Sequence, residues 1–258
     1  DFLIDVKRIP VPNANNIDKI LNDLKKIASK YKIAGFIYEP MIQGAAGMKI
    51  YDAETMNAIL DFFKQNDIIT IADEVMTGFG KTGKNFASEY IATKPDIICM
   101  SKALTGGLLP MAITSCSEKI YNAFLSNKIE KGFFHCHTYS ANPIACSAAL
   151  AVIELLQTQE IKNNIVAIAE SHKLFEQKIR QHPKVRRTRT LGVIFAVEIN
   201  IKMQRYGALR EKLLAHFMDN GVFLRPLGNT IYIQPPYVIS KKELNKIYNT
   251  IESCLDTF

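Results

Sequence analysis

The segments IADEVMTGFGKTG (71–83) and MSKALTGG (100–107) decide the fold class of this chain. Each follows a short apolar run, IITIA (68–72) or DIICM (96–100), of the kind that forms a buried strand. Apolar residues at helical spacing precede the first run, as in the stretch 17–32. Alternating strands and helices predict an α/β fold in which a mostly parallel sheet carries helices on its faces.

The chain as a whole divides into two parts near residues 157–160. We expect a large domain over 1–157 and a C-terminal α+β small domain over 158–258, because the strand and helix pattern changes there. The expected strands are 33–39, 111–115, 192–199, 222–225 and 231–234. The expected helices are 17–32, a helix capped by Asp52, 142–156, 160–181, 206–219, and a last helix that begins at a capping box from Ser240 to Glu243.

Asp73 and Lys102 are the candidate chemical groups, because each lies at or just past the end of a predicted strand. Ligands of open parallel sheets bind beyond the carboxyl ends of the strands. A carboxylate there can hold a proton on a pyridine nitrogen, and a lysine beside the Gly106-Gly107 turn can bond to an aldehyde. Taken singly, an ordinary turn aspartate and a surface lysine are the alternatives, although the neighbours of Lys102 are apolar.

A nucleotide site is the competing interpretation of the same region. Gly78, Gly80 and Gly83 form a literal G-x-G-x-x-G after a strand. A dinucleotide loop must cradle a pyrophosphate at the start of a helix, but Asp73 and Glu74 would repel phosphate and no helix is predicted at Gly83. We therefore favour a cofactor anchor over a nucleotide loop.

The pair DEVMTGFGKTG and SKALTGG, with Asp73 and Lys102 twenty-nine residues apart, resembles the class III aminotransferases of pyridoxal 5'-phosphate (PLP) fold type I. EPMIQGAAGM (39–48) is similar to another loop of that family. FFHCHTYSANPIACSAALA (133–151) and VFLRPLGNTIYIQPPYVIS (222–240) resemble the branch that aminates 8-amino-7-oxononanoate in biotin synthesis. The resemblance runs over essentially the whole chain.

This resemblance implies PLP as cofactor and a role for each matching residue. Asp73 would pair with the pyridine nitrogen, and Lys102 would be the catalytic lysine that bonds to the cofactor aldehyde. Thr138 would bind the cofactor phosphate across a dimer interface, with His137 beside it. Arg225 would receive the substrate carboxylate, a task that suits a guanidinium.

Two residues depart from the family pattern. Cys136 stands where the family has glycine at a substrate-contacting position, and Lys81 stands where many members have arginine. Both bear on the amino donor more than on the reaction type. The run His135-Cys136-His137 offers no full zinc ligand set, so we expect it to line the substrate pocket and we predict no metal.

The resemblance implies S-adenosylmethionine as amino donor, a keto acid as acceptor and 7,8-diaminononanoate as product. It also implies a homodimer, and family members carry an N-terminal part with phosphate and ring contacts before the region that matches Asp1. The alternatives are another class III enzyme acting on an ω-amino acid, and a catalytically silent fragment that serves in interactions.

Composition limits the other classes of function. The five cysteines form no CxxC pair, which favours a reducing cytoplasm over a disulfide framework. No apolar run is long enough to cross a bilayer, so no membrane partner is expected. The formal charge is +7, but the one dense basic stretch, HPKVRRTRT (182–190), has no interleaved aromatic residue. We interpret it as a solvated loop and predict no nucleic-acid binding.

Overall fold

The computed structural model describes residues 4–201 and 207–258. Its N-terminal part contains a four-stranded sheet in the order β1-β4-β5-β6 and a separate two-stranded β2-β3 ribbon. The elements of this part are α1 (Ile17–Lys30), β1 (Gly35–Tyr38), β2 (Ile42–Gln43), β3 (Lys49–Ile50), α2 (Ala53–Gln65), β4 (Ile69–Asp73), η1 (Ala87–Tyr90), β5 (Ile97–Met100), η2 (Lys102–Thr105), β6 (Ile113–Cys116), α3 (Glu118–Phe124), η3 (Ile129–Lys131) and α4 (Pro143–Gln157).

The C-terminal part is built on a three-stranded antiparallel sheet in the order β7-β8-β9. Its helices pack against that sheet and bury one continuous apolar core, which includes Phe195, Phe217 and Ile251. The elements of this part are α5 (Gln159–Ile179), β7 (Val185–Leu191), β8 (Ile194–Ile199), α6 (Ala208–Asp219), β9 (Thr230–Ile233) and α7 (Lys241–Thr257).

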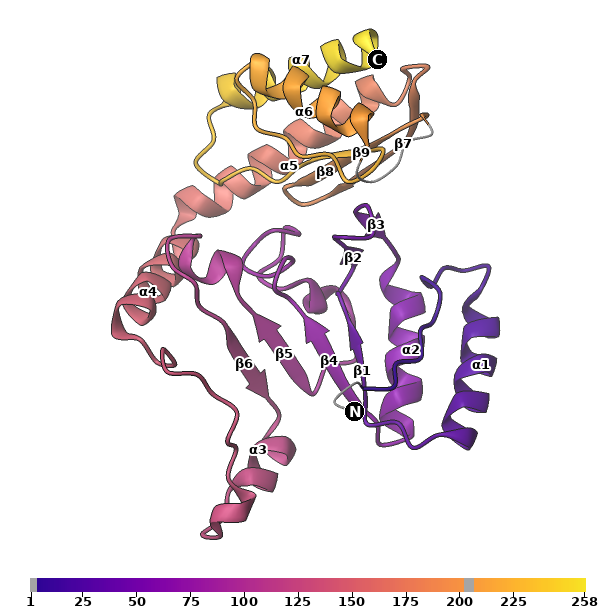
Figure 1. The fold of residues 1–258 in the computed structure, drawn as a ribbon, viewed down its shortest axis with the longest axis vertical. Helices are drawn as coiled ribbons and strands as arrows, with labels where there is room; N and C mark the ends of the chain where they lie inside the picture. Colours follow the sequence, from indigo (N-terminus) through magenta and orange to yellow (C-terminus); the bar gives the residue numbers. More distant parts are fainter. Residues whose placement is uncertain (1–3, 202–206) are drawn as a thin grey trace.

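The strand register of the larger sheet confirms the predicted α/β class. β1 runs parallel to β4, and β4 runs parallel to β5, whereas β6 is antiparallel to β5. Ile59, Leu60 and Phe63 on the inner face of α2 join Ala72 of β4 in the core of this part. The carboxyl ends of three strands therefore meet at one edge, and the C-terminal part lies beyond that edge (Figure 1).

Local sequence signals explain where several helices begin. The Asp52 carboxylate accepts a hydrogen bond from Thr55 N at 2.8 Å, as expected for a cap. Asn142 accepts from Ile144 N at 2.9 Å and so caps α4. The predicted capping box is present as well, since Ser240 and Glu243 bond each other's backbone N–H groups.

Two predictions about the C-terminal part are wrong. Residues 222–225 form no strand. Val222 and Leu224 are buried and Phe223 and Arg225 are exposed, but no strand among the described residues pairs with this segment. The basic stretch at 182–190 is not a solvated loop, because most of it forms β7. Arg189 is only 10% exposed and pairs with Glu198 of β8, so its charge is neutralised within the sheet.

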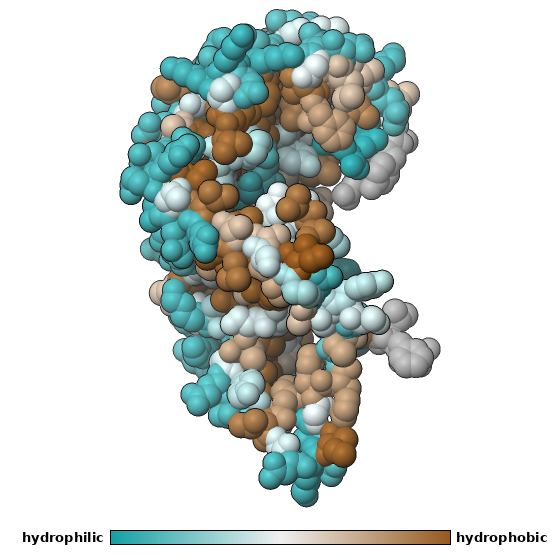
Figure 2. All heavy atoms as spheres, turned by 90° about the vertical axis from the view of Figure 1, so that its left-hand side faces the viewer, coloured by the Kyte–Doolittle hydropathy of each residue, from teal (hydrophilic) through white to brown (hydrophobic). Residues whose placement is uncertain are grey.

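An exposed apolar surface covers the face on which α4 lies, where Figure 2 shows apolar side chains gathered across the middle of the molecule. Ile144 and Leu150 of α4 are 70% and 62% exposed, and Phe133 and Phe134 before it are 66% and 73% exposed. Patches of this kind mark surfaces that other molecules cover.

Over the described ranges, no single helix is both long and apolar enough to cross a membrane. By length and composition alone, α4 and α5 pass such a test only as a pair bent by 71°.

Candidate active site

Asp73 and Lys102 lie at the same edge of the sheet, on neighbouring parallel strands. Asp73 ends β4 and is in register with Cys99 of β5, and Lys102 follows the end of β5. The Asp73 side chain is half-buried, and its Oδ1 accepts one hydrogen bond from Val75 N at 3.1 Å. Lys102 is exposed. The topology therefore brings a carboxylate and a primary amine to the place where such sheets bind ligands.

The backbone at Lys102 is held in an unusual conformation. Its φ is +45°, in the left-handed region that side chains rarely adopt, and Gly106 and Gly107 follow with φ of +63° and +83°. Hydroxyls on both sides of the lysine fix the turn: Ser101 donates to Met111 O and Thr105 donates to Leu109 O, each at 2.6 Å. Strain of this kind persists where the surrounding structure fixes a functional residue.

Glu74 holds the loop that follows Asp73, a role that the sequence analysis missed. Its side chain is fully buried, with one oxygen accepting from Thr77 Oγ1 at 2.5 Å and Ala87 N at 3.0 Å. The other oxygen accepts from Ser88 N at 2.6 Å. A carboxylate bound in this way faces the loop interior and anchors the chain beside Asp73. The only sequence signal for this anchoring role of Glu74 was its place beside Asp73.

The chemistry of these groups fits PLP. A half-buried carboxylate with one hydrogen bond has capacity to hold a protonated ring nitrogen. An exposed primary amine on an adjoining strand end can reach an aldehyde. Within residues 4–201 and 207–258, no ion pair occupies either group.

Arg225 lines a cavity of about 570 Å³ in the C-terminal part. The cavity also contains Arg210 of α6, which the sequence analysis did not single out and which no motif marks. Tyr232 and Gln234 complete its polar lining, and Gln234 Nε2 donates to Met76 O at 3.4 Å. That bond ties the arginine cavity to the loop that begins at Asp73.

Cys136, His137 and Thr138 lie in the irregular segment between η3 and α4, and all three are exposed. The hydrogen bonds of His137 are local: its Nδ1 accepts from Tyr139 N at 3.1 Å, and its backbone N donates to Ser140 Oγ at 3.3 Å. The structure thus brings Asp73 and Lys102 together but leaves these three residues on the surface. Their expected contacts with cofactor and substrate stay predictions.

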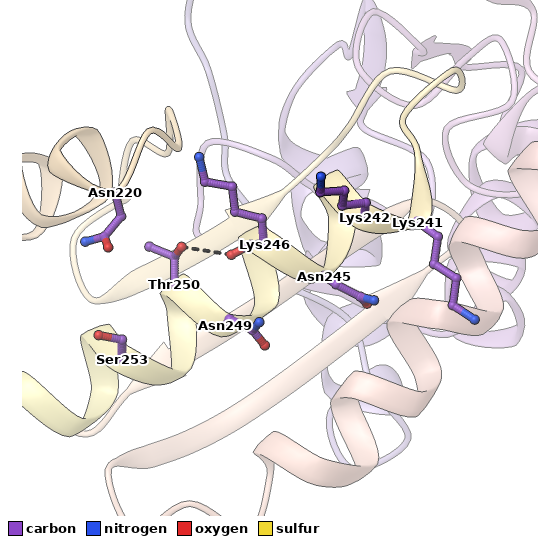
Figure 3. A pocket seen from close by; sticks show the side chains of 8 residues that line it. All are labelled: Asn220, Lys241, Lys242, Asn245, Lys246, Asn249, Thr250 and Ser253. Carbon is purple, nitrogen blue, oxygen red and sulfur yellow. Dashed lines mark hydrogen bonds between the residues drawn. The ribbon is translucent and has the colours of Figure 1, made fainter.

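Other candidate sites carry no comparable chemistry. The part of the chain that the structure describes holds no group of three histidine, cysteine or acidic side chains able to bind a metal ion. A larger but shallow cavity of about 780 Å³ lies along α7 and contains none of the predicted site residues (Figure 3). Its lining is basic and amide side chains and two hydroxyls: Asn220, Lys241, Lys242, Asn245, Lys246, Asn249, Thr250 and Ser253. We interpret it as the solvated face of the helix.

Comparison with known proteins places this geometry in a family. A family model described as aminotransferase class III matches residues 2–255. An adenosylmethionine-8-amino-7-oxononanoate aminotransferase of Synechococcus elongatus is 40% identical over 227 residues, which are 87% of this chain and 53% of that protein. The chain therefore spans about half the length of the curated relatives it matches.

Two solved structures are similar in fold. The adenosylmethionine-8-amino-7-oxononanoate aminotransferase of Methanocaldococcus jannaschii gives a TM-score of 0.85 at 30% identity, over 93% of this chain and 57% of that one. A thermostable (S)-enantioselective omega-transaminase from Thermomicrobium roseum also gives a TM-score of 0.85, at 26% identity, over 94% and 56% of the two chains.

Proposed function

This chain belongs to the class III aminotransferases, and on that premise we propose that it transfers an amino group from S-adenosylmethionine to 8-amino-7-oxononanoate. The product would be 7,8-diaminononanoate, an intermediate of biotin synthesis. The observation that carries the proposal is the pairing of Asp73 and Lys102 at adjoining strand ends. The names of the relatives from Synechococcus and Methanocaldococcus support the choice of substrates.

Each residue has a task that its position allows. PLP, when bound, supplies an electrophilic aldehyde and a cationic ring that accepts electrons. Asp73 would keep a proton on the ring nitrogen of bound PLP, and Lys102 would serve as general base and acid toward the substrate Cα. Arg225 binds the substrate carboxylate through its guanidinium.

The exposed segment around Thr138 suits a contact with a second copy of the chain. We propose that Thr138 and His137 bind the cofactor phosphate in a neighbouring subunit's site, and that Cys136 faces substrate there. A homodimer would also cover the apolar residues near α4. The division into a PLP-binding domain over 1–157 and a small domain over 158–258, and a cytoplasmic location, belong to the same proposal.

The test is an assay of the PLP-loaded protein with S-adenosylmethionine and 8-amino-7-oxononanoate, in which 7,8-diaminononanoate is measured by mass spectrometry. Lys102→Ala is the control, because it removes the amine of an exposed side chain that is not packed in the core. Product formation that depends on Lys102 supports the proposal. No product from the wild type, under conditions where another donor converts the cofactor, would contradict it.

A second candidate is amino transfer from an ω-amino acid. The similarity to the Thermomicrobium transaminase favours it, and so does Cys136, which stands where the family has glycine and so bears on the choice of amino donor. The same assay separates the two candidates when β-alanine replaces S-adenosylmethionine as donor.

A further inference from the structure

A seam of hydrogen bonds joins the loop after Asp73 to the C-terminal part of the chain. The seam consists of four hydrogen bonds, and a backbone carbonyl is the acceptor in each. The bonds therefore require the two backbone segments to lie close together. The four bonds are Gln234 Nε2 to Met76 O at 3.4 Å, Tyr237 Oη to Phe79 O at 2.5 Å, Lys81 Nζ to Pro235 O at 3.5 Å and Val193 N to Lys81 O at 3.0 Å.

Glycines make this close approach possible. A Cβ on Gly80 would lie 2.8 Å from Ile165 Cδ1 and 3.2 Å from the Tyr237 hydroxyl. A Cβ on Gly192 would lie 2.2 Å from the backbone carbon of Thr82. Both glycines also have positive φ, so two independent restrictions keep side chains out of the seam.

Lys81 is the charged member of the seam. Its ammonium lies 4.3 Å from the centre of the Tyr237 ring, where a cation is attracted by the ring face. Burial lowers the pKa of Lys81 to about 8. No carboxylate among the described residues lies within 4.0 Å of the Lys81 ammonium, so the ring and the Pro235 carbonyl are its partners.

The groups packed around Lys81 are few. Glu74 is turned into its own loop, Lys84 lies over the ring of Tyr90, and His172 lies behind Val193 with its Nε2 against Val193 O. The segment 234–237 and the turn between β7 and β8 contribute no titratable side chain other than Tyr237. Lys81 is therefore the group of this seam whose charge changes near pH 8.

We propose that Lys81 and Tyr237 form a clamp that positions the Arg225 cavity relative to Asp73 and Lys102. Segment 234–237 begins at Gln234, which lines that cavity, and it ends at Tyr237, which bonds to the loop after Asp73. Both are positioning residues, because they act on substrate through Arg225. The inference rests on the proposed function for the role of Arg225 as a carboxylate site.

The test measures calorimetric binding of nonanoate, a plain nine-carbon carboxylate, to the PLP-loaded protein between pH 7 and pH 9.5. Nonanoate keeps its charge over this range, whereas Lys81, whose pKa burial lowers to about 8, loses its proton. We expect wild-type affinity to fall roughly threefold to tenfold as pH rises, the range of an exposed to partly buried cation–π contact. Lys81→Arg stays charged, so its affinity should change little with pH.

Two further variants and a control complete the design. Lys81→Met should bind nonanoate about as weakly at pH 7 as the wild type does at pH 9.5. Tyr237→Phe removes only the bond to Phe79 O, and it should bind more weakly while keeping the pH dependence. Lys84→Met is the matched control, because Lys84 lies over a tyrosine ring on the same loop but contacts no part of the cavity. It should behave as wild type.

Three results would overturn the clamp. The first is unchanged nonanoate affinity in Lys81→Met and Tyr237→Phe despite a lower unfolding temperature, which would show a structural role alone. The second is a pH dependence that persists in Lys81→Arg. The third is nonanoate binding that is unchanged in the Arg225→Met variant, or a wild-type protein that does not bind nonanoate at all. If the binding pattern holds but no 7,8-diaminononanoate forms, the proposed function fails and the clamp stands.

Discussion

Replacing Glu74 by glutamine should destabilise the chain strongly, although the substitution changes very few atoms. Glu74 is fully buried, and its two oxygens accept three hydrogen bonds, two of them from the backbone N–H groups of Ala87 and Ser88. Glutamine presents one oxygen and one NH2 group. In either orientation the NH2 group faces one of those backbone donors, while the Thr77 hydroxyl can rotate to accept.

The magnitude follows from this count. One buried N–H left without an acceptor costs about 1–3 kcal/mol, and the remaining bonds weaken because they lose the charge on the acceptor. Together we expect a loss of roughly 2–4 kcal/mol in the free energy of unfolding. For a chain of this size that corresponds to a fall of roughly 5–15 °C in the unfolding temperature.

Thermal and urea unfolding of the Glu74→Gln variant would measure this loss, and Glu89→Gln is its control. Glu89 makes a similar bond on the same loop, to Phe86 N at 2.9 Å, but it is exposed. Its amide can accept that bond and water can solvate the rest, so we expect a change below about 0.5 kcal/mol. The reasoning is refuted if Glu74→Gln unfolds within 0.5 kcal/mol of the wild type, or if the Glu89 variant loses as much.

Three other outcomes are expected. Borohydride reduction of the PLP-loaded protein followed by peptide mapping should place the pyridoxyl group on Lys102, and a label found only on other lysines would disprove its role. Asp73→Asn should weaken transition-state stabilisation by several kcal/mol, which steady-state measurement of turnover would show. It should weaken PLP binding by less, which a cofactor titration would show. Burial lowers the pKa of His172 to about 4 from an unfolded value near 6.5, so the folded state binds fewer protons between these values. Stability should therefore fall as pH drops from 6.5 to 4, by up to about 3 kcal/mol, and the fall should be absent from urea unfolding of His172→Gln.

Much of the fold follows from short-range signals in the sequence. The strand runs that end near Asp73 and Met100 are apolar and short, and the capping residues Asp52 and Ser240 bond backbone groups within three positions of themselves. Such signals act locally, so the elements they predict agree with the structure to within a few residues. Parallel pairing of β4 and β5 followed from the helices and loops between strands.

The failures occur where the pattern needs a distant partner. Residues 222–225 alternate between buried and exposed positions as a strand does. Such alternation shows that one face of the segment packs on the core, but it does not show that a neighbouring strand pairs with it. Arg189 looks like a solvated charge until Glu198 of β8 and the Gly47 carbonyl are placed beside it. These partners offset the charge of one arginine in the basic strand.

Some features of the candidate site could likewise be predicted from the sequence, and others could not. The sequence by itself determined that Asp73 and Lys102 stand at strand ends, because the apolar runs that form β4 and β5 end just before them. Only the tertiary structure decided that Glu74 turns inward, that Arg210 joins Arg225 and that Lys81 bonds to Pro235, 154 positions away. The Glu74 and Arg210 contacts depend on how the chain folds back within one part of the molecule, and the Lys81 contact depends on how the two parts pack. No local pattern of residues specifies which side chains meet in these places.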